Sequence, residues 1–310
     1  MLIVFGAISM ELHVPLEQFP TATTQAIAHD YTLHAGGKAA NQAYAATRSG
    51  AKVALIGKTG DDDYSRRILE KVRREGVITS GVGKTDNVHT GLEIVCTNED
   101  NERQIIKSPG ANAFSSADQI PEEILDEAAI ILIQSDLSMK ENAALLKKAK
   151  ENGATTMMNL SPSINISNDI LASLDYLILN SREATKFAKK LGISSETGAN
   201  KIAQALAKLG NLTCVITKSE KGSIAYTKEG KGYATPALQL ENFVDHNGAE
   251  DAYCGTFAAC LQNKSPLTEA LKRASIAASL SCERVGGLHA FPYLDDITKK
   301  MDDLNDPQEV

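Results

Sequence analysis

The sequence predicts an α/β fold in which an open, doubly wound and mostly parallel sheet is flanked by helices. Along the 310 residues, short apolar runs of strand length alternate with longer amphipathic runs of helix length. The longer runs place apolar residues on one helix face, as Ile202, Leu206 and Leu209 do. Ligands bind such sheets at the carboxyl ends of the strands, so we expect the functional residues there.

Seven runs have strand character and eight have helix character. The predicted strands are Leu2–Ile8, Lys52–Gly57, Ile130–Gln134, Thr155–Leu160, Tyr176–Leu179, Thr213–Thr217 and Gly222–Tyr226. The predicted helices are Ala39–Ser49, Tyr64–Glu75, Lys140–Asn152, Ser181–Leu191, Ala199–Leu209, Asp251–Gln262, Pro266–Val285 and Leu294–Leu304.

Two segments interrupt this alternation. The first is about His13–Leu33, and the second is Thr90–Lys107, whose alternating apolar residues on either side of the turn Asn98–Asn101 predict a β-hairpin. Together they predict a small sheet apart from the main one. The tail Asp302–Val310 is expected to be frayed.

Composition and charge limit the possible partners. Hydrophobic residues make up 43% of the chain, and the net charge is −7 with a pI near 5.5. An acidic chain lacks the basic face that nucleic acid requires, so a small-molecule partner is expected. No apolar run approaches the roughly 20 residues of a membrane span, and the apolar start lacks the basic region of a signal peptide. We therefore expect a cytoplasmic protein without a membrane partner.

The cysteines follow no metal-binding or disulfide pattern. They are scattered without CxxC spacing, which predicts reduced and mostly buried thiols. The five are Cys96, Cys214, Cys254, Cys260 and Cys282.

The stretch Val244–Phe257 has the pattern expected for phosphate chemistry. An apolar run leads into a polar turn with a Gly248-Ala249 pair, and Asp251 then opens an apolar helix. Free backbone N–H groups at a helix start bind phosphate, and a carboxylate beside them can take a proton from a hydroxyl. The alternative is an acidic helix cap without chemistry, which this stretch alone would favour.

Polar residues elsewhere also follow predicted strands or open helices. Gly36 and Gly37 allow close approach of the backbone to a ligand, and Lys38 and Asn41 offer donors; a Gly-rich helix cap is the alternative. Five more residues are candidates by position, with solvated loops or helix caps as the alternatives: Ser9, Glu11, Asp136, Asn180 and Glu183. Mg²⁺ prefers oxygen ligands such as the last two offer.

Two of these stretches resemble the signatures of the ribokinase-like (PfkB) family of carbohydrate and nucleoside kinases. Val244–Phe257 resembles Asp-Thr-x-Gly-Ala-Gly-Asp, with His246 in place of Thr and Glu250 in place of the last Gly. Ala35–Ala43 resembles Gly-Gly-Lys-Gly-Ala-Asn-Gln-Ala, with Ala39 in place of one Gly. The second form is more similar to ribokinase than to fructokinase, which favours a pentose.

The resemblance implies ATP-dependent phosphorylation of a hydroxyl of a small sugar, most simply a pentose such as ribose. It implies one ribokinase-like domain over residues 1–310, with lid segments at about 10–34 and 88–108 that exclude water from the transfer. Asp251 would be the general base, and the amides of Gly248, Ala249 and Glu250 would stabilise the transferred phosphoryl group.

The resemblance also assigns the surrounding residues to ligands. Sugar contacts are implied for Ser9, Glu11, Gly37, Lys38, Asn41 and Asp136. Nucleotide contacts are implied for Asn180, Glu183, Thr217, Lys218, Ser219 and Gly222, with Glu183 holding Mg²⁺ through water. A monovalent cation, K⁺, is implied at Asp245 and Asn247, near the segment 284–287. Ser9, Glu11, Asp136 and Ser219 differ from the residues usual in ribokinases.

Glu250 leaves the activity open. A carboxylate about 5 Å from the phosphoryl group, at an effective dielectric constant near 20, costs on the order of 3 kcal/mol. One alternative is therefore a degenerate homologue that binds sugar or nucleotide without turnover, and another is a nucleoside kinase. Exposed lid strands would also suit a homodimer.

Overall fold

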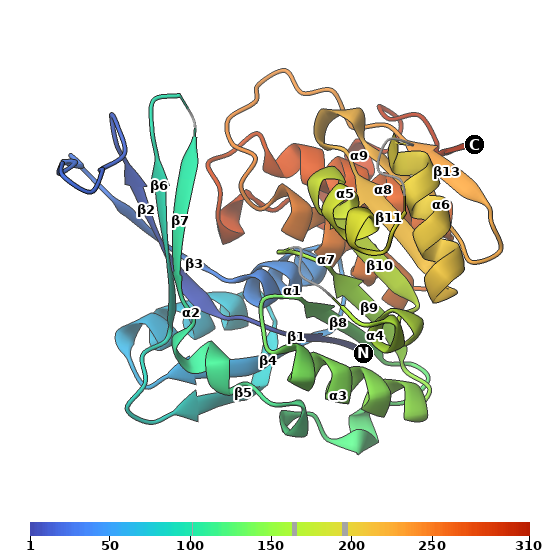
Figure 1. The fold of residues 1–310 in the computed structure, drawn as a ribbon, viewed down its shortest axis with the longest axis horizontal. Helices are drawn as coiled ribbons and strands as arrows, with labels where there is room; N and C mark the ends of the chain where they lie inside the picture. The colour runs from blue at the N-terminus through green and yellow to red at the C-terminus, as the bar shows by residue number, and fades with distance from the viewer. Residues whose placement is uncertain (101, 163–165, 194–197) are drawn as a thin grey trace.

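A computed structural model describes residues 1–100, 102–162, 166–193 and 198–310. Within these residues the chain forms a ten-stranded sheet, here called sheet A, and a four-stranded sheet, sheet B, which stands to one side of it (Figure 1). Asn101, in the predicted turn of the hairpin, lies outside the described residues.

Sheet A has the strand order β14-β13-β12-β11-β10-β9-β8-β1-β4-β5. All neighbours from β11 to β5 are parallel, and the three pairs from β11 to β14 are antiparallel. The strands are β1 Leu2–Phe5, β4 Val53–Gly60, β5 Ile78–Thr85, β8 Ile130–Gln134, β9 Thr155–Asn159, β10 Tyr176–Asn180, β11 Thr213–Thr217, β12 Ser223–Tyr226, β13 Gly232–Thr235 and β14 Gln308–Glu309. The predicted doubly wound, mostly parallel sheet is confirmed.

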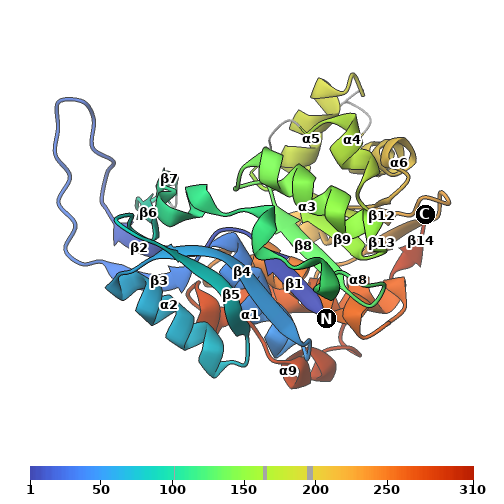
Figure 2. The same cartoon turned by 90° about the horizontal axis from the view of Figure 1, so that it is seen from below.

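Helices cover both faces of sheet A (Figure 2), which explains why its central strands are continuous apolar runs. In β1, Leu2 and Val4 face one hydrophobic cluster, whereas Ile3 and Phe5 face the other. The first cluster includes α1 Lys38–Arg48, α2 Asp63–Arg74, α7 Ala249–Gln262 and α8 Leu267–Ser281. The second includes α3 Met139–Glu151, α4 Asn168–Ala172, α5 Ser181–Lys190 and α6 Gly198–Gly210.

The close packing of α1 on α7 brings two distant parts of the sequence together. A Cβ atom on Gly255 would lie 2.5 Å from the Gln42 carbonyl oxygen and 2.8 Å from Ala45 Cβ, so only glycine fits here. The hydroxyls of Thr256, the next residue of α7, and Ser49, at the end of α1, lie 2.8 Å apart. Because the helices run side by side from their first turns, the residues at both helix starts meet at one edge of sheet A.

Sheet B has the order β3-β2-β6-β7. Its strands are β2 Ser9–Pro15, β3 Thr32–Gly36, β6 Gly91–Thr97 and β7 Arg103–Ser108. The β6–β7 pair is the predicted hairpin, and β2 pairs parallel with β6 and antiparallel with β3. The chain between β2 and β3 extends away from both sheets (Figure 2). The two segments that interrupt the α/β alternation thus form a separate small sheet, as predicted.

Several predicted boundaries are wrong. The first strand ends at Phe5, not Ile8, because Ser9 already pairs within sheet B. The strands β5, β13 and β14 were not predicted: β5 mixes polar residues and two glycines without a clear period, and β13 and β14 are only four and two residues long. The tail is also not simply frayed: β14 pairs with β13, and Lys272 Nζ lies 2.6 Å from Asp306 Oδ1.

Three helix boundaries also differ from the prediction by two residues or more. The helix α8 ends at Ser281 instead of Val285, and α9 spans Leu294–Lys299 instead of reaching Leu304. The helix α7 begins at Ala249, two residues before the predicted start. The five cysteines are free, and four are buried, as predicted. In the described part of the chain, no helix has the length and apolar character to cross a bilayer.

Candidate active site

Gly248 sets the start of α7. It is the N-cap residue with φ 85°, a left-handed conformation that glycine adopts without strain, and a Cβ atom there would approach the Phe291 ring to 2.9 Å. Asp251 is therefore the third residue of the helix and does not open it, which corrects the predicted start. Of the three amides expected to bind phosphate, that of Ala249 donates to the His246 carbonyl at 3.3 Å.

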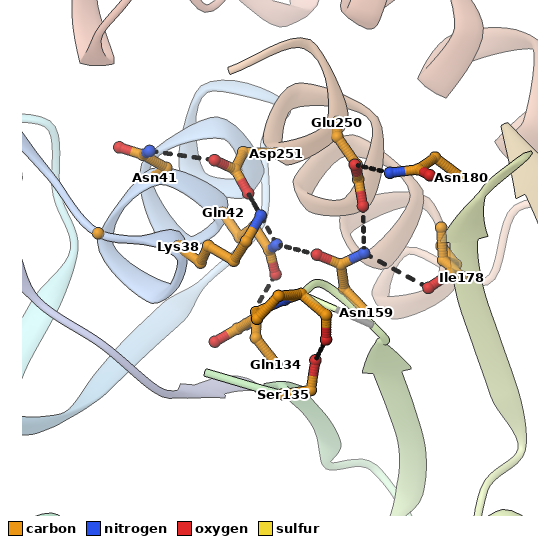
Figure 3. Close-up of polar contacts among 12 residues, drawn as sticks. Lys38, Asn41, Gln42, Gln134, Ser135, Asn159, Ile178, Asn180, Glu250 and Asp251 are labelled. Atoms are coloured by element: carbon orange, nitrogen blue, oxygen red, sulfur yellow. Dashed lines mark hydrogen bonds and ion pairs between the residues drawn. The ribbon is translucent and has the colours of Figure 1, made fainter. Parts of the chain in front are cut away.

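The Asp251 carboxylate is buried in polar surroundings and is 6% exposed as a residue. It accepts hydrogen bonds from Asn41 Nδ2 at 3.0 Å and Gln42 Nε2 at 2.9 Å, and Lys38 Nζ lies 4.0 Å away (Figure 3). Burial raises the pKa of Asp251, and Lys38, Gln42 and Asn41 only partly offset this effect. The result is a carboxylate that is more basic than usual.

Lys38 is the positive charge at the centre of the site. Burial alone would lower its pKa, but the nearby carboxylates outweigh burial and raise the pKa well above its usual value. These carboxylates are Asp251, Glu250, Asp136 and Glu183. One ammonium group is thus influenced by the charges of four acidic side chains, which come from the two helices α5 and α7 and from the loop after β8.

A chain of buried amides connects these groups, and the sequence analysis did not identify it. Gln42 Nε2 donates to Asn159 Oδ1 at 3.1 Å as well as to Asp251, and Gln134 Nε2 donates to Gln42 Oε1 at 2.7 Å. All three amide side chains are fully buried. Gln134 and Asn159 are the last residues of β8 and β9, and polar residues at these strand ends were the available indication.

Glu250 is held on the side of the site opposite Lys38 and Asp251. Its Oε1 accepts from Asn159 Nδ2 at 2.6 Å and its Oε2 from Asn180 Nδ2 at 3.2 Å (Figure 3). Two amide donors on two neighbouring strands therefore fix the carboxylate toward β9 and β10. The side chain that replaces the signature glycine has its own polar partners.

Asn180 and Glu183 form a capping box at the start of α5. Asn180 Oδ1 accepts from the Glu183 amide at 3.0 Å, and Glu183 Oε2 accepts from the Asn180 amide at 3.0 Å. Burial, followed by the charge of Glu250, raises the pKa of Glu183 to about 7. The two residues thus cap α5, as the alternative interpretation of the sequence held. In addition, the carboxylates of Glu183 and Glu250 lie close enough to repel each other.

Ser9 and Glu11 lie at the start of β2, close to the start of α1. The side chain of Asn112 binds Ser9, with Asn112 Nδ2 donating to Ser9 Oγ at 3.1 Å. Glu11 Oε1 accepts from the Gly37 amide at 3.3 Å, and His13 Nε2 lies 3.2 Å from Glu11 Oε2. Burial acts to raise the pKa of Glu11, but the bonds from His13 and Gly37 lower it overall, so this carboxylate stays charged.

Asp136 follows β8 and is the clearest sign of a missing ligand. Both carboxylate oxygens are buried, and neither has a hydrogen-bond partner among the described residues. Burial raises the pKa of Asp136 to about 6, and the charge of Lys38 only partly opposes it. Buried polar atoms are rarely left without a partner, so a bound molecule with hydroxyl groups would suit this position.

The segment 217–222 forms a tight loop after β11. The Thr217 carbonyl accepts from Ser181 Oγ at 3.1 Å, which joins the loop to the start of α5. Ser219 has φ 52°, the left-handed conformation that the family's glycine would adopt easily, and Gly222 has φ 75°. Lys218 closes the loop, because its amide donates to the Gly222 carbonyl at 2.7 Å.

Asp245 and Asn247 lie against Gly286, as expected. The positively charged side chain of Arg103 also reaches this turn. Asp245 Oδ1 accepts from the Asn247 amide at 3.0 Å, and Asp245 Oδ2 from the Gly286 amide at 2.9 Å. In addition, Arg103 Nη2 lies 2.7 Å from Asp245 Oδ1. A guanidinium group thus stands where the resemblance implies a monovalent cation, and the site does not fit a free ion.

The structure therefore brings most of the predicted residues to one edge of sheet A. A buried carboxylate and lysine at two adjacent helix starts, beside a second small sheet, are the arrangement expected of a small-molecule kinase. The chain belongs to the pfkB family of carbohydrate kinases, whose family model matches residues 1–292.

Individual relatives agree with this assignment. The chain is 27% identical over 304 residues to the ribokinase of Lactococcus lactis, and the match covers 97% of each protein. The structure of Arabidopsis thaliana ribokinase complexed with ribose and ATP matches with a TM-score of 0.86 at 26% identity, covering 97% of this chain and 98% of that one. The Thermotoga maritima ribokinase structure shares the fold, with a TM-score of 0.88 at 24% identity and coverage of 97% and 99%.

We expect Asp136→Asn to stabilise the protein at neutral and alkaline pH. A folded-state pKa of about 6, above the usual 3.8, means that the stability contributed by protonated Asp136 is lost as the pH rises through 6. The substitution should raise the free energy of unfolding at pH 8 by on the order of 3 kcal/mol and leave it unchanged near pH 3.5. Urea unfolding at both pH values checks this, with the exposed Asp86→Asn as control. A destabilised variant at pH 8 would contradict the assignment.

Proposed function

We propose that the protein catalyses ATP-dependent phosphorylation of a hydroxyl of a small sugar, most simply a pentose such as ribose. The observation that carries the proposal is the Asp251 carboxylate, held by Asn41 and Gln42 and lying 4.0 Å from Lys38 at the start of α7. The relatives support the substrates, since one of the matching ribokinase structures is a complex with ribose and ATP.

In the proposed reaction Asp251 acts as the general base. Its raised pKa favours uptake of the hydroxyl proton as the hydroxyl oxygen bonds to the terminal phosphorus of ATP. The bond between that phosphorus and the bridging oxygen breaks, ADP leaves, and the proton remains on Asp251. Lys38 and the amides at the start of α7 would offset the charge on the phosphoryl oxygens.

Mg²⁺ suits the acidic side of the site. No group of three or more His, Cys, Asp or Glu side chains in the described ranges is arranged to bind a metal ion. The two carboxylates of Glu183 and Glu250 nevertheless form an oxygen-rich edge, where an ion held in part through water would relieve the repulsion that contributes to the raised pKa of Glu183. When bound with ATP, Mg²⁺ offsets phosphate charge.

The sugar is proposed to lie between sheet B and the start of α1. Ser9, Glu11 and the Gly37 amide come from that side, and Lys38, Asn41 and the unpartnered Asp136 carboxylate complete the set. Glu11 and Asp136 are acceptors for sugar hydroxyls. Sheet B, with the lid segments at about 10–34 and 88–108, would exclude water from the transfer.

The contacts of Glu250 favour an active enzyme over a degenerate one. Asn159 and Asn180 hold its carboxylate away from Asp251, which lessens the repulsion of a phosphoryl group beside Asp251 and Lys38. The strands of sheet B also favour a sugar over a nucleoside. Their described residues include no Phe, Tyr or Trp that could stack on a base.

We also propose a homodimer formed through sheet B. The edge strand β7 leaves Ile105 51% and Ile106 63% exposed, and an edge with apolar residues favours pairing with a second copy. Ile106→Lys should reduce the sedimenting mass from dimer to monomer in analytical ultracentrifugation. A wild-type protein that sediments as a monomer at micromolar concentration would contradict the proposal.

Asp251→Asn should lower kcat by about 10²–10⁴-fold because it removes the base, while the affinity for ATP changes little. A coupled assay of ADP release with ribose, and calorimetry with ATP, measure the two effects. Asp86→Asn, at an exposed position, should match the wild type. Retention of full activity by Asp251→Asn would rule out its role as base.

Glu250→Gly tests whether the departure from the signature impairs turnover. Because Glu250 points toward Asn159 and Asn180, we expect the native chain to turn over ribose and the variant to change kcat by less than about tenfold. The same ADP-release assay, run with pentoses, hexoses and nucleosides, measures both proteins. Turnover only in the variant would support the degenerate alternative, and turnover only with nucleosides would support the nucleoside kinase.

A further inference from the structure

The pair formed by Arg103 and Asp245 joins the two sheets of the molecule. Arg103 is the first residue of β7 in sheet B, whereas Asp245 lies three residues before Gly248, the N-cap of α7. The two residues are separated by 142 positions, and Arg103 Nη2 lies 2.7 Å from Asp245 Oδ1. Their side chains are 24% and 17% exposed, so the pair is largely shielded from solvent.

The remaining contacts of Asp245 leave its carboxylate fully engaged. The Asn247 and Gly286 amides bind one oxygen each, and a Cβ atom on Gly286 would lie only 2.8 Å from Asp245 Oδ2. Burial acts to raise the pKa of Asp245, but these two amides and Arg103 lower it overall. The carboxylate is therefore charged, and the guanidinium provides the balancing positive charge.

We propose that Arg103 takes the place of a monovalent cation at Asp245, so that the protein folds and binds nucleotide without K⁺. Arg103 is then a positioning residue, which acts through Asp245 and holds the turn before α7. The same contact ties the β6–β7 hairpin of sheet B to that turn. The part of the inference that concerns nucleotide rests on the proposed function, but the ion pair and its effect on stability do not.

The geometry explains how a side chain could replace an ion here. A guanidinium group is always charged, and its planar N–H groups bind a carboxylate with defined direction. Because Arg103 is covalently part of sheet B, its local concentration at Asp245 does not depend on the surrounding salt. A free ion would have to displace the guanidinium to reach Asp245 Oδ1.

The experiment compares the wild type, Arg103→Met and Arg103→Lys in KCl and in tetramethylammonium chloride at equal ionic strength. Tetramethylammonium is too large to replace K⁺ beside the largely buried Asp245 carboxylate. Arg66→Met is the matched control, because Arg66 is 70% exposed and pairs with an exposed Asp63. Two quantities are measured: the melting temperature of each protein, and its affinity for ADP by calorimetry.

The wild type should have the same melting temperature in both salts and ADP affinities that agree within about twofold. Arg103→Met should melt lower and bind ADP about three- to tenfold more weakly in tetramethylammonium, and K⁺ should recover part of both losses. Arg103→Lys, which keeps the charge, should depend on K⁺ less than Arg103→Met. Arg66→Met should behave as the wild type.

Two results would overturn the proposal. One is a wild type that needs K⁺, with ADP affinity falling more than about tenfold in tetramethylammonium. The other is an Arg103→Met variant that responds to K⁺ no more than the wild type does. If the wild type binds no ADP, the proposed function fails, and the melting temperatures in the two salts still decide the role of Arg103. If Arg103→Met does not fold, the wild type and Arg103→Lys still provide the comparison.

Discussion

The balance of charge around Lys38 is the constraint on which the rest of the site depends. The charges of Asp251, Glu250, Asp136 and Glu183 together keep this single ammonium group charged in spite of its burial. Unpaired charges are costly to bury, so the carboxylates that exceed the single lysine need further partners. Amides supply some of these partners, and bound ligands are proposed to supply the others.

The packing of α1 against α7 makes this charge balance possible. Gly255 and the small residues of α1 let the two helices approach closely, which sets Lys38 and Asn41 beside Asp251. The fully buried amide of Gln42 then bridges Asp251 and Asn159, and so connects the helix pair to the end of β9. Backbone packing and side-chain polarity therefore depend on each other at this edge of sheet A.

Two charged side chains near the start of α7, Glu250 and Asp245, are both bound by partners from distant parts of the chain. Glu250, in the position of a glycine, lies against Asn159 and Asn180, which together bind both of its carboxylate oxygens. Arg103, from β7 of sheet B, binds Asp245. In each case a charge is matched by a polar partner from a distant element, which limits the cost of introducing it.

The sequence by itself determined the central parallel sheet, its helices and the two glycine-containing turns, because apolar period and turn chemistry are local properties that each stretch carries alone. It also placed Asp251, Lys38 and Asn180 in one candidate site through their motifs. Only the tertiary structure decided that Gln42, Gln134 and Asn159 form one amide chain, where Glu250 points, and that Arg103 meets Asp245. These contacts join residues dozens to more than a hundred positions apart, and no local pattern specifies which distant partner a buried polar group will find.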